Sequence, residues 1–162
     1  MRPAVWADIG SGRGAFTLAL AELLGPGGQI HSVDRDARAL RVQQDALRAL
    51  FPGTLVQFHA ADFTRALDLP LLDGLVMANA LHFVEDARKE SVVARLKSAL
   101  RHGGRFILVE YNVDRGNLWV PHPLSYTAWE SLAARCGFAG TRLLAKTPST
   151  FLHEFYAALS TT

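Results

Sequence analysis

The chain has 162 residues, a length typical of one domain and short for two independently folding units. Hydrophobic residues make up 49% of it and charged residues 20%, which argues against a disordered, collagen-like or coiled-coil protein. Lys and Arg exceed Asp and Glu by 17 to 15, a net charge of +2 that does not by itself demand a polyanionic partner. We expect residues 1–162 to form a single domain.

Cysteine content and the absence of targeting signals bear on location. The one cysteine, Cys136, excludes an internal disulfide and a multi-thiolate metal site, and it fits a reducing compartment. The N-terminus lacks the profile of a signal peptide, and no apolar run approaches the roughly 20 residues that cross a bilayer. No histidine pair has the spacing of a metal site on one helix face. We therefore expect a cytoplasmic protein without metal or membrane contact.

The first half of the chain predicts two strand–helix units and a third strand. Strands are predicted at residues 4–9, 29–33 and 55–59. The first helix carries apolar residues on one face and ends in the Gly-Pro-Gly-Gly of residues 25–28; that face comprises Phe16, Leu20, Leu23 and Leu24. The second helix begins near Asp36 and ends at Pro52-Gly53. The residues of this helix that we expect to face the sheet are Leu40, Leu47, Leu50 and Phe51.

The next segment predicts strands at residues 75–78 and 105–111 with a helix between them. Asp86 can cap this helix, and Gly103-Gly104 can close it. Its inward positions are Val92, Val93, Leu96 and Leu100.

The end of the chain predicts a helix and a hairpin. Thr127 and Glu130 have capping-box spacing before a helix that ends at Gly137 and carries Trp129, Leu132, Ala133 and Cys136. The strand-like runs 141–146 and 151–159 are too close for a crossover helix, so they should pair antiparallel. Together these elements predict an α/β fold, an open and mostly parallel sheet with helices on both faces.

Ligands of open α/β sheets bind at the carboxyl ends of the strands. After the first strand, Asp8 precedes a glycine-rich turn formed by Gly10, Gly12 and Gly14, which lets the backbone approach a ligand. Ala15 also completes a loose dinucleotide pattern. Asp34 ends the second strand, where a carboxylate can accept hydrogen bonds from two ribose hydroxyls. These residues indicate a nucleoside but leave its identity open.

The chain resembles the class I S-adenosylmethionine-dependent methyltransferases over nearly its whole length. The acid and alternating glycines of residues 8–14 match that family's first motif, Asp34 in Ser-Val-Asp-Arg matches its ribose-binding acid, and Asp62 stands where the family reads the adenine amino group. The C-terminal hairpin is similar to the family's sixth and seventh strands. The resemblance implies a Rossmann-like, seven-stranded sheet and S-adenosylmethionine as cofactor. The residues it implies for cofactor binding are Asp8, Gly10, Gly12, Gly14, Asp34, Arg35, Asp62, Phe63 and Asn79.

The resemblance also implies that the ends of the fourth and fifth strands face the acceptor. We expect Phe83, Glu110, Tyr111, Asn112 and Trp119 to contact it. Residues 111–126 are rich in aromatic side chains and proline and are expected to form a lid, although Trp119 could instead plug the sheet edge. Candidates for a proton acceptor are His122, Tyr126 and His82, while methyl transfer itself needs mainly alignment and exclusion of water.

The first predicted strand begins almost at Met1, whereas many family members that act on small molecules carry covering helices ahead of it. We therefore expect an open site that is closed by the loop around Trp119, by a second subunit or by a large substrate.

Several functions remain open. The leading hypothesis is methyl transfer to a small-molecule acceptor; methylation of RNA or protein, a non-catalytic S-adenosylmethionine-binding module, and nicotinamide-dependent redox chemistry are the alternatives. Asn79 is followed by Ala80 and Leu81 rather than by the Pro-Pro-aromatic motif of many nucleic-acid methyltransferases, so a nucleic-acid partner is not expected. One cysteine also disfavours arsenite as the acceptor. A homodimer is left open.

Overall fold

The computed structural model describes residues 2–162 and contains one seven-stranded sheet with the order β3-β2-β1-β4-β5-β7-β6. Its strands are β1 Val5–Ile9, β2 Gln29–Asp34, β3 Leu55–Ala60, β4 Leu72–Ala78, β5 Leu100–Tyr111, β6 Gly140–Pro148 and β7 Glu154–Thr161. The helices are α1 Ala15–Leu24, α2 Ala37–Leu50, α3 Asp86–Ser98 and α4 Tyr126–Arg135, with short 3-10 turns η1 Gly25–Gly27 and η2 Leu81–Phe83. None of the helices in this described range is long and apolar enough to cross a membrane.

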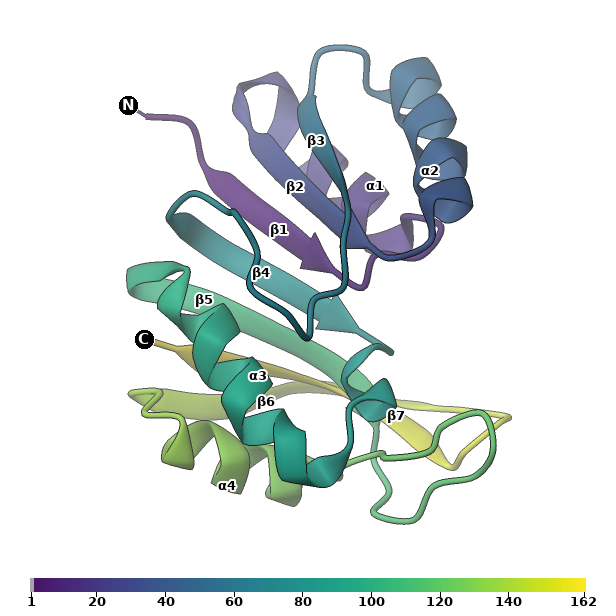
Figure 1. The fold of residues 1–162 in the computed structure, drawn as a ribbon, viewed down its shortest axis with the longest axis vertical. Helices are drawn as coiled ribbons and strands as arrows, with labels where there is room; N and C mark the ends of the chain where they lie inside the picture. Colours follow the sequence, from purple (N-terminus) through teal and green to yellow (C-terminus); the bar gives the residue numbers. More distant parts are fainter. Residues whose placement is uncertain (1) are drawn as a thin grey trace.

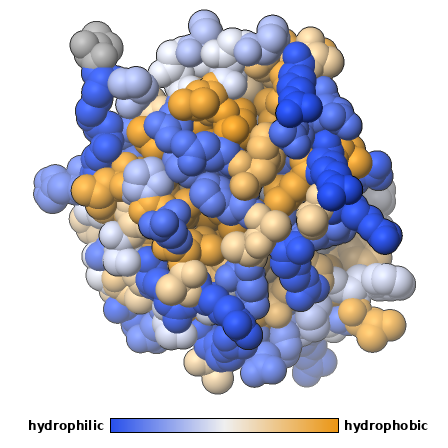
Figure 2. Space-filling model, turned by 45° about the horizontal axis from the view of Figure 1, so that its top comes forward, coloured by the Kyte–Doolittle hydropathy of each residue, from blue (hydrophilic) through white to orange (hydrophobic). Residues whose placement is uncertain are grey.

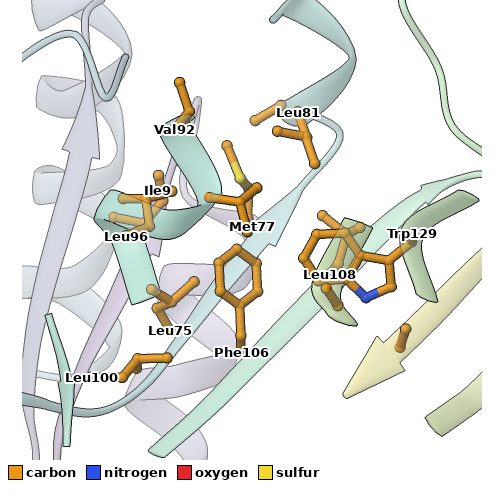
Figure 3. Close-up of a cluster of buried hydrophobic side chains, with 14 of the residues drawn as sticks. Ile9, Leu75, Met77, Leu81, Val92, Leu96, Leu100, Phe106, Leu108 and Trp129 are labelled. Carbon is orange, nitrogen blue, oxygen red and sulfur yellow. The ribbon is translucent and has the colours of Figure 1, made fainter. Parts of the chain in front are cut away.

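Helices cover both faces of the sheet, with α3 and α4 in front and α1 and α2 behind and beside it in Figure 1. The side chains of β4 alternate between the two resulting cores. Val76 packs with Leu20 of α1 and Leu47 of α2. Leu75 and Met77 join the larger core under α3 and α4, which includes Leu96, Phe106 and Trp129 (Figure 3). Because both faces are buried, the central strands are apolar throughout rather than alternating.

The predicted fold class is confirmed. Strands β3, β2, β1, β4 and β5 pair in parallel, and the C-terminal hairpin pairs antiparallel as expected. The hairpin enters the sheet through β7, which lies between β5 and β6 and is antiparallel to both. The break in strand order between β1 and β4 marks the switch point at which such sheets bind ligands.

The predicted inward faces of the first two helices were partly wrong. In α1 the buried residues are Thr17, Leu20 and Ala21, whereas Leu23 is 82% exposed and Phe16 also faces solvent. The hydroxyl of Thr17 donates to Asp8 Oδ2 over 2.6 Å, which fixes the rotation of the helix on the sheet.

In α2, Leu40 and Leu47 are buried as predicted, but Leu50, the last residue of the helix, is 65% exposed. The polar side chain of Gln43 is buried between the two leucines.

Three predicted helix boundaries also need correction. Glu85, not Asp86, is the N-cap of α3, and Asp86 is already helical and pairs with Lys89. Gly103-Gly104 does not close α3: both glycines lie within β5, which starts at Leu100, at an irregularity in its pairing with β4. Ser125 rather than Thr127 caps α4, because its Oγ accepts the backbone N–H of Ala128 over 3.3 Å.

Candidate functional site

A cavity of about 420 Å³ lies at the carboxyl ends of β1, β2, β3 and β4. It contains most of the residues that the sequence singled out for a nucleoside. The lining comprises Gly10, Gly12, Asp34, Arg35, Ala61, Asp62, Phe63, Thr64, Asn79, Ala80, Phe83, Val84 and Arg88.

The glycine-rich turn between β1 and α1 forms one wall of this cavity. The backbone N–H groups of Gly10 and Ser11 both donate to the carbonyl of Val33, which ties the turn to the end of β2. Gly10 has φ +72°, and a Cβ atom there would lie 2.5 Å from the Cβ of Ala80. Only glycine fits at this position, and its missing side chain leaves the backbone open to a ligand.

A buried polar network supports the turn from behind. Gln43 Nε2 donates to Ser11 Oγ and to the carbonyl of Gly12, each over 2.9 Å. Ser32 Oγ lies 2.8 Å from both Gln43 Oε1 and Ser11 Oγ; its single hydrogen goes to the amide oxygen of Gln43, which can only accept, and it accepts from the Ser11 hydroxyl. Sequence reasoning missed Gln43 as a support, although a lone polar residue on the apolar stripe of α2 was a usable signal.

Asp34, the last residue of β2, lines the cavity and is fixed by two backbone hydrogen bonds. Its Oδ2 accepts the N–H of Gly12 over 2.7 Å, and its Oδ1 accepts the N–H of Asp36 over 2.8 Å. Each carboxylate oxygen can accept a further hydrogen bond. The two oxygens are therefore oriented by the backbone and still able to accept two hydroxyl donors.

Asp62 and Phe63 line the same cavity. The N–H and the hydroxyl of Thr64 both donate to Asp62 Oδ1, over 2.9 and 2.7 Å. These hydrogen bonds lower the pKa of Asp62 below its ordinary value, so the carboxylate stays ionised and its Oδ2 can accept from an amino group. The ring of Phe63 offers an apolar surface beside it. The set fits a planar heterocycle that bears an amino group and a vicinal diol.

Asp8 and Gly14 do not line the cavity but support the turn from inside. Asp8 is 2% exposed. Burial raises its pKa to about 6, with a smaller contribution from Asp34, against the hydrogen bonds from Thr17 that lower it. Gly14 has φ +88°, and a Cβ there would lie 2.5 Å from the Cβ of Gln43.

At the end of β4, Asn79 lines the cavity in a left-handed conformation with φ +52°. A non-glycine residue in this conformation is uncommon and clusters at functional sites. Two arginines, Arg35 and Arg88, also line the cavity, and sequence reasoning had singled out only the first.

His82 and Glu110 form a buried pair beside the cavity. His82 Nδ1 lies 2.8 Å from Glu110 Oε2, and the backbone N–H groups of His82 and Tyr111 also donate to this carboxylate, over 3.2 and 3.3 Å. Because a carboxylate accepts, the imidazole donates through Nδ1, and in the neutral ring Nε2 is then the acceptor nitrogen. His82 is 3% exposed and does not itself line the cavity, whereas its neighbour Phe83 does.

The predicted lid contacts the site mainly through its backbone. The N–H of His122 donates to the carbonyl of His82 over 3.0 Å, and the carbonyl of His122 accepts from Lys89 Nζ. Trp119 is 70% exposed, and neither it nor His122 lines the cavity.

The remaining predicted acceptor residues are held by other contacts. The hydroxyl of Tyr126 donates to Glu130 over 3.2 Å, and burial together with Glu130 raises its pKa, which makes it a poor proton acceptor at neutral pH. Asn112 binds the N–H of Tyr126 and a carboxylate oxygen of Glu154. Of the acceptor residues predicted from the sequence, Phe83 is the one that lines the cavity.

A second cavity, of about 300 Å³, lies between α2 and β3 and is lined by Leu47, Phe51 and Phe58 among others. On the face in Figure 2, hydrophobic patches are interrupted by strongly hydrophilic side chains. Within residues 2–162, no three His, Cys, Asp or Glu side chains come close enough to hold a metal ion.

Comparison with known proteins identifies methyltransferases. Residues 7–104 match a family model described as a methyltransferase domain. The acetylserotonin O-methyltransferase of Mus musculus is 30% identical over 178 residues, covering 95% of this chain and 43% of the mouse protein. The ubiquinone/menaquinone biosynthesis C-methyltransferase UbiE of Pseudomonas savastanoi pv. phaseolicola is 32% identical over 115 residues, covering 68% of this chain and 43% of that protein. The chain thus spans less than half the length of these curated relatives.

Solved structures share the fold over the whole chain. The 1,6-didemethyltoxoflavin-N1-methyltransferase of Burkholderia thailandensis, solved with 1,6-didemethyltoxoflavin and S-adenosylhomocysteine, aligns with a TM-score of 0.76 at 22% identity. The alignment covers 99% of this chain and 72% of that one.

Proposed function

The chain belongs to the class I S-adenosylmethionine-dependent methyltransferase family, and on that premise we propose that it transfers a methyl group from S-adenosylmethionine to a small-molecule acceptor. The observation that carries this proposal is the cavity in which Asp34 and Asp62 lie with Phe63 beside the glycine-rich turn. The free acceptor positions of Asp34 suit the ribose hydroxyls, and Asp62 suits the adenine amino group. Both acids and the ring thus fit adenosine.

S-adenosylmethionine, when bound, supplies an electrophilic methyl group on a sulfonium. The chain's own residues must therefore orient the cofactor and the acceptor and exclude water. The acceptor's proton is best taken by His82, because Glu110 holds its ring through Nδ1 and the ring packs against Phe83, which lines the cavity. Among the three predicted proton acceptors, this one has the support of a buried carboxylate.

A small-molecule acceptor is supported by the names of similar proteins. The mouse relative is named for acetylserotonin, and the Burkholderia structure holds 1,6-didemethyltoxoflavin. The same fold serves enzymes with different acceptor atoms, so the proposal extends to the class of acceptor and not to one compound.

We also propose a cytoplasmic location for the protein, because a single cysteine fits a reducing compartment.

Substitution of Asp34 tests the proposed cofactor site. Asp34→Ala removes both ribose hydrogen bonds, and we expect it to weaken S-adenosylhomocysteine binding by on the order of 2 kcal/mol, roughly thirtyfold in Kd. Asp34→Asn, which keeps the shape of the side chain, should weaken binding less. Calorimetric titration of both variants measures the effect.

The matched control is Asp45→Ala, which removes an exposed acid from α2 outside the cavity. Its affinity for S-adenosylhomocysteine should equal that of the unaltered protein. Unchanged affinity in a folded Asp34→Ala protein would refute the assignment of Asp34.

A further inference from the structure

The connection between β3 and β4 carries the residues proposed to contact adenine, yet it contains no helix or strand. It comprises residues 61–71 and runs as a coil from one strand to the other in Figure 1. Asp62, Phe63 and Thr64 of this connection line the cavity. A coil of this kind depends on contacts with other elements to hold a side chain in one direction.

One residue of α3 reaches this connection. Arg95 Nη1 donates to the carbonyl of Thr64 over 2.7 Å. The start of the connection is tied to β2, since the N–H of Ala61 donates to the carbonyl of Asp34 over 3.0 Å. Within the described residues 2–162, Arg95 supplies the one hydrogen bond that joins residues 62–71 to another element.

Arg95 helps to fix a single peptide group of the connection. The carbonyl of Thr64 and the N–H of Arg65 belong to the same planar group and point in opposite directions. The N–H donates to the carbonyl of Asp62 over 3.0 Å, while the carbonyl accepts from Arg95. The peptide group is therefore held from both sides, and it cannot rotate without losing a hydrogen bond.

The orientation of this peptide group is passed on to the Asp62 carboxylate. The N–H and the hydroxyl of Thr64 both hold Asp62 Oδ1, so a rotation of Thr64 would carry the carboxylate with it. These hydrogen bonds from Thr64 are also the main reason why the pKa of Asp62 is lowered, with smaller contributions from the charges of Arg65 and Arg35. Arg95 thus acts on Asp62 through Thr64.

We propose that Arg95 is a positioning residue for nucleobase recognition, which aims Asp62 Oδ2 at the amino group of adenine by holding the Thr64 carbonyl. This inference rests on the proposed function and deepens it, because it gives α3 a part in the choice of nucleobase. A carboxylate held in this direction accepts from the C6 amino group of adenine but repels the C6 carbonyl of hypoxanthine.

Two nucleosides that differ at C6 test the inference. S-adenosylhomocysteine and S-inosylhomocysteine, in which a carbonyl replaces the amino group, are each titrated by calorimetry into the unaltered protein and into Arg95→Met. We expect the unaltered protein to prefer the adenine nucleoside by at least about tenfold. In Arg95→Met this preference should fall about fivefold, through weaker binding of S-adenosylhomocysteine alone.

Two further variants separate positioning from general stability. Arg95→Lys keeps a charged donor and should retain most of the preference. Lys97→Met removes a cation from the same helix, over the ring of Phe138, and should leave the preference unchanged. Equal losses of affinity for both nucleosides in Arg95→Met would show a merely structural role and overturn the inference, and so would an unchanged preference.

The inference and the proposed function fail in different ways in this experiment. If the unaltered protein binds neither nucleoside, the proposed function is refuted and the inference with it. If the unaltered protein binds S-adenosylhomocysteine and S-inosylhomocysteine equally well, the role of Arg95 in nucleobase choice is overturned while the proposed function stands.

Discussion

At the scale of single residues, Asp8 has a measurable consequence for stability. Burial raises its pKa from 3.8 to about 6 in the folded protein. Between these values the unfolded chain has released the proton while the folded chain still holds it, so folding becomes less favourable as the pH rises. The stabilisation that Asp8 gives below pH 3.8 is therefore lost as the pH passes through about 6.

Asp8→Asn removes this dependence and keeps an oxygen for the Thr17 hydroxyl. Relative to the variant, the unaltered protein should lose roughly 2 kcal/mol of unfolding free energy between pH 4 and pH 7. Urea unfolding at both pH values measures the difference, with Asp45→Asn as the control on α2. Parallel pH dependences in the unaltered protein and Asp8→Asn would show that Asp8 is not perturbed by burial.

The residues of the site differ in how well the sequence could predict them. Asp34 was found because it ends a predicted strand, where ligands of such sheets bind, and Asp62 was found through the resemblance to the methyltransferase family; both line the cavity. Arg88 was missed because it lies on a helix surface, where a single residue does not reveal which neighbours the fold brings to it. Trp119 was overvalued: an aromatic residue in a loop predicts contact only when the path of that loop is known.

At the scale of elements, Lys89 holds the segment between β5 and α4. The side chain is buried in α3, pairs with Asp86, and donates to the carbonyl of His122 over 2.5 Å. The N–H of His122 donates to the carbonyl of His82, so one helix residue anchors this segment next to the proposed proton acceptor.

Lys89→Met keeps the length of the side chain but removes the donor. We expect the amide of His122 to exchange its hydrogen at least about fivefold faster, because the carbonyl left without a partner costs on the order of 1–3 kcal/mol. Hydrogen exchange followed by NMR measures this rate. Lys97→Met, on the same helix over the ring of Phe138, is the control; equal exchange rates in the two variants would contradict the anchoring role.

Most helices and strands could be predicted from the sequence, because the apolar runs end where glycine or proline residues interrupt the chain. The errors lie where two local signals compete. Thr127 and Glu130 have the right spacing for a cap, but Ser125 lies at the actual helix start and satisfies its N–H groups first. Gly103 was taken as a helix end, whereas pairing with β4 draws the same residues into β5 with an irregular register.

At the scale of the whole molecule, the strand order creates the site. The order β3-β2-β1-β4-β5 brings the turn after β1, the acids after β2 and β3, and η2 after β4 to one edge. The residues of the proposed cofactor site thus come from four separate segments and are brought together by the topology of the sheet.

The most direct measurement is calorimetric titration of the purified protein with S-adenosylmethionine, S-adenosylhomocysteine and NADH in parallel. We expect saturable binding of the two sulfur nucleosides and none of NADH, because Asp34, Asp62 and Phe63 fit an adenosine in a chain that belongs to the methyltransferase family. Binding of NADH alone would contradict the methyltransferase function and make the glycine-rich turn a dinucleotide site.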